Sequence, residues 1–133
     1  MYTVPLTVTN DGSSPCYLLG YPTIAMYDTS GAVLAFVYTH TGDMVVTARP
    51  PNRVDLAPGS SAFATINKYR CDLGPGPQAT SLTLVAPGDT TPWPIAIIQY
   101  ATLNFCGPGD PGSIVAVSPV AATLTATLNE GTG

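Results

Sequence analysis

Apolar and polar residues alternate with a period of two in several segments of the chain, which is typical of strands with one buried face. Residues 2–9 alternate Tyr, Val and Leu with Thr and Pro, and they predict a half-buried strand. Because Pro5 has no amide hydrogen, we expect it at a sheet edge or on the polar face. Residues 122–128 alternate Ala and Leu with Thr, and they predict a final strand. The continuous apolar run at 32–39 predicts a strand covered on both faces.

Turn-forming residues separate these segments from the rest of the chain. Further strands are predicted at 23–28, 60–67, 81–87, 94–103 and 113–120. Loops rich in Gly, Pro, Asn or Asp are expected at 10–15, 73–78 and 107–112. About eight or nine short strands without a helix favour an all-β antiparallel β-sandwich, with a barrel as the second choice. We expect one domain over residues 1–129 and a flexible C-terminal end at 130–133.

Charge is scarce in this chain. Charged residues make up 9% of it and hydrophobic residues 45%, and the formal net charge is −4. Disorder requires the opposite balance, so a folded domain is expected. Four Lys and Arg residues are too few for the basic surface that binds nucleic acid or anionic lipid. No apolar run reaches the ~20 residues of a transmembrane helix.

The chain contains three cysteines, Cys16, Cys71 and Cys106, and they form no C-x-x-C motif of a zinc or redox site. An all-β chain of this composition is typical of extracytoplasmic proteins, in which disulfides persist. Three cysteines allow three pairings, and one thiol remains unpaired or bonds outside the chain. Strand-like sequence follows Met1 directly, so we expect a leader that is not part of this chain, with a cytosolic protein as the alternative.

Catalytic and metal-binding arrangements have little support in the sequence. Cys16, His40 and Asp43 contain the parts of a nucleophilic set, but nothing in the sequence brings them together. Asp72 and Asp110 lie in loops that lack the spacing of a calcium site. The sequence therefore predicts no enzyme activity, no metal site and no cofactor.

Aromatic residues are the remaining signal for a binding site. Trp93 is the single tryptophan and lies between two prolines, where its ring could stack against a sugar or a proline-rich peptide. Trp93 and Tyr100 are therefore the candidate ligand contacts. The alternative interpretation is that Trp93 closes one end of the sandwich and that Tyr100 lines a strand face.

A longer pattern spans most of the chain. Its first part is Asn10, Gly12, Ser13, Cys16, Leu18, Gly20, Tyr21, Pro22, Asp28 and Gly31. Its later parts are Val54, Leu56, Pro58, Gly59, Ser60 or Ser61, Ala62, Cys71, Leu82 to Gly88, Cys106, Gly107, Val117, Pro119 and Val120. Over about residues 4–120 the chain resembles the secreted actinobacterial family called domain of unknown function 4232.

The resemblance implies an extracytoplasmic immunoglobulin-like sandwich, secreted or in the cell envelope, without an assigned activity. It also implies a Cys71–Cys106 disulfide and leaves Cys16 without a partner in the chain. Members of the family usually begin with one more strand that carries a cysteine, the natural partner of Cys16, and that strand is absent here. We therefore expect an exposed sheet edge beside the missing strand.

These observations favour a non-catalytic extracytoplasmic module with a structural or protein-interaction role. Its expected partner is a protein, or a second copy of the chain, at the exposed sheet edge. The first alternative is a small-ligand or glycan-binding module that uses the region around Trp93. The second alternative is an assembly protein such as a virion component.

Overall fold

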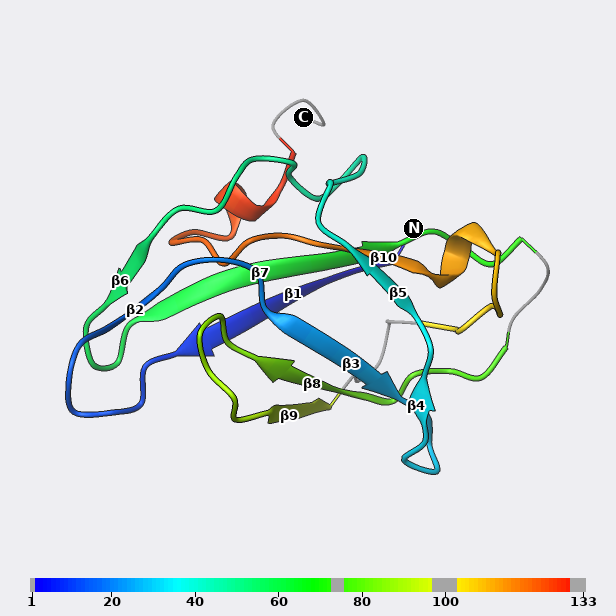
Figure 1. Ribbon diagram of the computed structural model, residues 1–133, viewed down its shortest axis with the longest axis horizontal. Helices are drawn as coiled ribbons and strands as arrows, with labels where there is room; N and C mark the ends of the chain where they lie inside the picture. Colours follow the sequence, from blue (N-terminus) through cyan, green and yellow to red (C-terminus); the bar gives the residue numbers. More distant parts are fainter. Residues whose placement is uncertain (1, 73–75, 97–102, 130–133) are drawn as a thin grey trace.

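A computed structural model describes residues 2–72, 76–96 and 103–129, and these residues form ten strands and two short 3₁₀ helices, with no α-helix among them (Figure 1). The strands are β1 (Tyr2–Thr9), β2 (Cys16–Leu18), β3 (Thr23–Tyr27), β4 (Val33–Leu34), β5 (Val37–Thr39), β6 (Val54–Leu56), β7 (Ser61–Lys68), β8 (Ser81–Val85), β9 (Trp93–Ala96) and β10 (Ile114–Val117). The 3₁₀ helices are η1 (Pro111–Ser113) and η2 (Thr125–Thr127). The described residues contain no helix that is long and apolar enough to cross a membrane.

Two four-stranded sheets form the body of the molecule, in a sandwich-like arrangement. One sheet has the strand order β1-β7-β10-β5 and the other β4-β3-β8-β9. The strand pairs are antiparallel apart from β5 and β10, which run parallel. The predicted all-β fold is confirmed. A separate pair, β2 with β6, lies at the end of the molecule opposite η1 (Figure 1).

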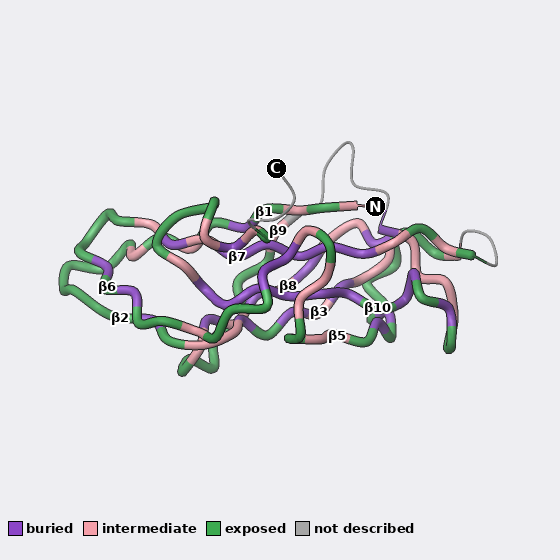
Figure 2. Tube along the Cα trace, turned by 90° about the horizontal axis from the view of Figure 1, so that it is seen from above, coloured by how far each residue is buried: buried purple, intermediate pink, exposed green. Residues whose placement is uncertain are grey.

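The core lies between the two sheets, where buried segments run through the middle of the molecule (Figure 2). Every second residue of β3 and β8 points inward, because successive side chains of a strand face opposite sides. The main cluster of buried residues comprises Leu6, Ile24, Met26, Leu34, Phe36, Ile66, Ala79, Leu82, Leu84, Leu103, Val115 and Val117. Both sheets contribute to this cluster, so each is stabilised by apolar area that the other covers.

The first strand agrees closely with its prediction. Leu6 is buried and Val8 is half-buried, whereas Thr7 and Thr9 are exposed. Among the described strands, β1 pairs only with β7 and forms an edge of its sheet, which is one of the two positions expected for Pro5.

Two predicted strands differ from the structure. The run at 32–39 divides into β4 and β5, and Val33 and Val37 are 65% and 56% exposed, so the predicted cover on both faces is wrong. Residues 122–128 form η2 with flanking bridges and no continuous strand. The reason is the hydroxyl of Thr127, which donates to the carbonyl of Leu124 at 2.6 Å and so stabilises a turn.

Most of the predicted strand at 94–103 lies outside the described residues, as does the predicted flexible end at 130–133. The described part of that strand begins one residue earlier, at Trp93, as β9.

Candidate functional site

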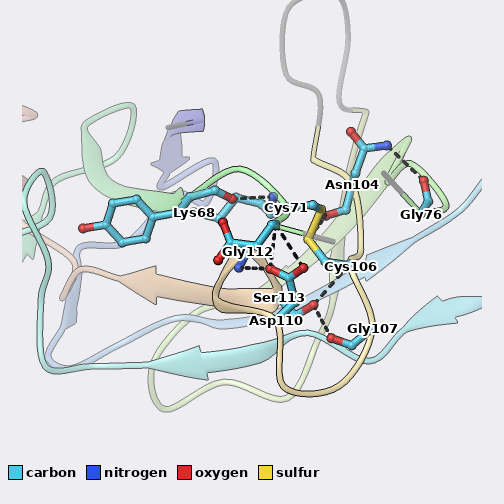
Figure 3. Close-up of a disulfide and its surroundings, with 11 residues drawn as sticks. Lys68, Cys71, Gly76, Asn104, Cys106, Gly107, Asp110, Gly112 and Ser113 are labelled. Atoms are coloured by element: carbon cyan, nitrogen blue, oxygen red, sulfur yellow. Dashed lines mark hydrogen bonds between the residues drawn. A yellow bond between two sulfur atoms is a disulfide. The ribbon is translucent and has the colours of Figure 1, made fainter. Parts of the chain in front are cut away.

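The structure contains the Cys71–Cys106 disulfide that the family resemblance implied, with Cα atoms 5.4 Å apart. A loop that contains η1 holds both sides of this bond (Figure 3). The amide of Cys106 donates to the hydroxyl of Ser113 at 3.1 Å. The amide of Asp72, the residue after Cys71, donates to both carboxylate oxygens of Asp110 at 3.0 and 3.1 Å. These hydrogen bonds attach the chain on both sides of the disulfide to the loop that contains η1.

Asp110 has a structural role and is 2% exposed. Its carboxylate also accepts a hydrogen bond from the amide of Gly112 at 2.9 Å, as the N-cap of η1. A carboxylate whose oxygens face backbone amides is poorly placed to coordinate a cation. The described residues contain no group of three or more His, Cys, Asp or Glu side chains that could hold a metal ion.

Lys68 lies close to the disulfide and is 1% exposed. Its ammonium group donates to the carbonyl of Tyr69 at 2.8 Å and lies 5.2 Å from the centre of the Tyr2 ring. Burial lowers the pKa of Lys68, and the negative charge of Asp110 partly opposes this effect. A cavity of about 250 Å³ adjoins Lys68. Because only 1% of Lys68 is exposed, its ammonium group is not available to a ligand in that cavity, and we assign it a structural role.

The three candidates for nucleophilic catalysis have separate surroundings. Asp43 accepts hydrogen bonds from the amides of Val45 and Val46 at 2.8 and 2.7 Å, and from the side chain of Asn67 at 2.7 Å. His40 is exposed, and its ring stacks on the ring of Tyr21, with 3.8 Å between the ring centres. Cys16 is a free, exposed thiol on β2. In the part of the chain that the structure describes, no hydrogen bond links these three side chains.

A groove at the open side of the sandwich is the best candidate for a binding site. It has a volume of about 220 Å³ and lies between the edge strands β1 and β9 of the two sheets. Its lining residues are Thr7, Val8, Thr9, Asp11, Leu84, Trp93 and Ile95. Trp93, which the sequence singled out, is 51% exposed here. The other candidate contact, Tyr100, lies outside the described residues.

The β1 side of the groove presents free backbone groups. Phe63, which lies opposite Thr7 on β7, exchanges both of its backbone hydrogen bonds with Ala121 at 2.8 Å. In an antiparallel pair, two opposite residues either bond to each other or both face away. The amide and carbonyl of Thr7 therefore face the free edge of β1. Pro5 lies opposite Thr65, whose backbone groups likewise bond elsewhere, to Ser118, so the free edge has no donor at Pro5.

The turn after β1 is held by hydrogen bonds of the Asn10 side chain and carries Asp11. The side chain of Asn10 accepts from the amide of Gly12 at 3.0 Å and donates to the carbonyls of Ser14 and Leu56 at 2.9 and 3.0 Å. Asp11 is exposed, and its carboxylate has no hydrogen-bond or ion-pair partner among the described residues. Sequence reasoning did not identify Asp11 or Thr7 as site residues, because nothing local links them to a tryptophan about eighty positions later.

Two sheets around a shared core, one disulfide and a tryptophan-lined edge groove define a disulfide-bonded β-sandwich domain. Residues 2–128 match the family described as Domain of unknown function (DUF4232), and the chain belongs to this family. No curated protein and no solved structure matches the chain.

Proposed function

We propose that this chain is a non-catalytic binding module that works outside the cytoplasm and takes its ligand at the groove lined by Trp93. The observation that carries the proposal is the groove itself. It combines a half-exposed indole with an apolar floor and a carboxylate, that of Asp11, which has no partner among the described residues. Concave apolar sites with a few polar groups at the rim are the usual places where proteins bind small ligands.

The surroundings of the catalytic candidates support a role without chemistry. The carboxylate of Asp43 is engaged by two backbone amides and an amide side chain, which leaves it poorly placed to orient a histidine. Among the described residues that line the groove, Asp11 alone carries a carboxylate, whereas glycoside hydrolysis requires a pair.

The disulfide supports the proposed location. Disulfides persist in oxidising compartments, so we propose a secreted or cell-envelope protein with an immunoglobulin-like sandwich. The test is alkylation of the native protein followed by intact-mass measurement. One labelled thiol before reduction, at Cys16, and three after reduction are expected. Three labelled thiols before reduction would contradict an oxidising compartment.

A structural or protein-interaction role through the free edge of β1 is the second candidate. The outward-facing backbone of Thr7 supports it, because an unpaired edge can accept a strand from a partner or a second copy. Pro5 weakens it, since the edge has no donor at that position. Light scattering over a wide concentration range tests self-association, and a mass that stays monomeric would argue against the self-association form of this role.

Titration of Trp93 tests the proposed function directly, because the chain has a single tryptophan. We expect one class among neutral oligosaccharides, anionic oligosaccharides and short peptides to change the emission of Trp93 in a saturable way. The same ligand should protect Trp93 from quenching by acrylamide. If no class does either, the groove is not a binding site and the proposal fails.

A further inference from the structure

We infer that the Trp93 groove binds a neutral sugar, with one pyranose ring against Trp93 and its hydroxyl groups hydrogen-bonded by Asp11 and Thr7. This inference rests on the proposed function and names the ligand class of the same groove.

The apolar part of the groove suits the C–H face of a sugar ring. Trp93 on β9 is directly opposite Leu84 on β8, and Ile95 follows on the same face of β9. Leu84 is 2% exposed and forms the floor, whereas Trp93 remains half-exposed at the rim. A pyranose has a face of C–H groups as well as an equatorial rim of hydroxyls. An aromatic ring beside an apolar floor therefore removes that C–H face from water.

The polar part of the groove suits the hydroxyl rim. The carboxylate of Asp11 lies on a turn held by hydrogen bonds of Asn10, and its oxygens have no partner in the described part of the chain, so they can accept hydrogen bonds from sugar hydroxyls. Thr7 contributes an outward-facing backbone amide, which can donate, and an outward-facing carbonyl, which can accept. The groove therefore presents donors as well as acceptors, which is the combination that hydroxyl groups require.

Charge selects among sugars. No Lys or Arg side chain is among the described residues that line the groove, and Asp11 makes it locally negative. The whole chain has a formal charge of −4. A uronate, a sulfated sugar or a phosphate-bearing glycan would meet repulsion without a compensating cation. Neutral hexoses are therefore favoured over anionic ones.

The edge of β1 argues against a peptide ligand. A peptide that adds as a strand needs a row of free backbone donors and acceptors. Here the row has no donor at Pro5 and ends at the turn that begins with Asn10, so between these two points only Thr7 and Thr9 offer both a donor and an acceptor. The volume of about 220 Å³ is below the ~300–1,000 Å³ of pockets for drug-sized ligands, which fits one ring better than a peptide segment.

Calorimetric titration with neutral tetrasaccharides of glucose, mannose and galactose, each in α- and β-linked forms where available, tests the inference. Oligogalacturonate and a proline-rich peptide serve as comparison ligands. We expect at least one neutral tetrasaccharide to bind. Trp93→Ala and Asp11→Ala should each weaken that binding about tenfold, while Trp93→Tyr, which retains a ring, should weaken it much less.

Matched control variants separate the groove from general surface effects. Tyr17→Ala removes an aromatic ring that is 55% exposed, and Asp55→Ala removes a carboxylate that is 74% exposed, both outside the groove. Both should leave the affinity within about twofold, well short of the tenfold loss expected for the groove variants.

Each alternative outcome has a distinct meaning. If only the peptide or only oligogalacturonate binds, and Trp93→Ala abolishes that binding, the proposed function stands and the neutral-sugar inference is wrong. Sugar binding that is unchanged in Trp93→Ala would place the sugar elsewhere and also overturn the inference. If no ligand of any class binds, both the inference and the proposed function fail.

Discussion

Tyr38 provides a sharp test of how the core is packed. It lies on β5 against the main core cluster, and its hydroxyl oxygen is buried without a hydrogen-bond partner among the described residues. Burial raises the pKa of Tyr38 from 10.0 to about 12, the backbone of Met26 partly offsets this effect, and the charge of Tyr27 adds to it. The folded state therefore disfavours the phenolate of Tyr38.

The effect of pH on stability follows from this pKa. Below pH 10 the hydroxyl is neutral in the folded and unfolded states, so its titration does not reduce the free energy of unfolding. Between pH 10 and about 12 the unfolded chain releases the proton first, and the folded state is progressively destabilised. The difference between 10.0 and about 12 corresponds to a loss of roughly 2–3 kcal/mol in the free energy of unfolding, at 1.36 kcal/mol per pKa unit. This value is an upper bound, because the ring is only partly buried.

Tyr38→Phe should remove this loss and keep the ring in the core. At pH 7 its free energy of unfolding should equal that of the natural chain or exceed it by about 1 kcal/mol, because a buried, unbonded hydroxyl is removed. Urea unfolding followed by circular dichroism from pH 7 to 12 measures both effects. Tyr17→Phe, at a ring that is 55% exposed, is the control and should leave the alkaline slope unchanged. Equal alkaline slopes in the natural chain and Tyr38→Phe, or a marked destabilisation at pH 7, would refute the reasoning.

Three further changes test the rest of the fold. Replacing both bridged cysteines with alanine should lower the free energy of unfolding by about 4 kcal/mol, as measured in urea, since the bond closes a loop with a sequence separation of 35. Gly112→Ala should destabilise by about 1–3 kcal/mol, because the new Cβ would lie 2.7 Å from a backbone oxygen and from a disulfide sulfur. Gly12→Ala is its control and should have a much smaller effect, since its closest contact would be 3.3 Å. Asp43→Ala should destabilise by about 2 kcal/mol in thermal unfolding, whereas His40→Ala should change stability by less than about 0.5 kcal/mol. Equal effects of the last two variants would contradict their separate roles.

Local signals in the sequence were reliable where one strand face is buried. The alternation at 2–9 predicted β1 and its inward face, and Pro5 predicted a position at the sheet edge or on the polar face. The strand predicted from the alternation at 122–128 was wrong. A threonine hydroxyl can donate to a carbonyl three residues earlier, and a turn held in this way is as compatible with the alternating pattern as a strand is. The run at 32–39 failed because hydrophobicity does not show that a strand face is covered, and two of its valines remain in solvent.

The amino-acid sequence by itself determined the all-β class and most of the strands, because these depend on the pattern of neighbouring residues. It also singled out Trp93 as a candidate ligand contact, because this tryptophan lies between two prolines. Only the tertiary structure brought Trp93 beside Asp11 and Thr7, since their proximity depends on which strands form the edges of the two sheets. It also showed that the carboxylate of Asp43 accepts hydrogen bonds from the amide of Val45 and from the side chain of Asn67 on β7. The sequence could not show this, because the second partner comes from a distant strand. Strand formation is decided by local periodicity, whereas sheet order and register are decided by the burial of the whole core, and they determine which side chains form the groove.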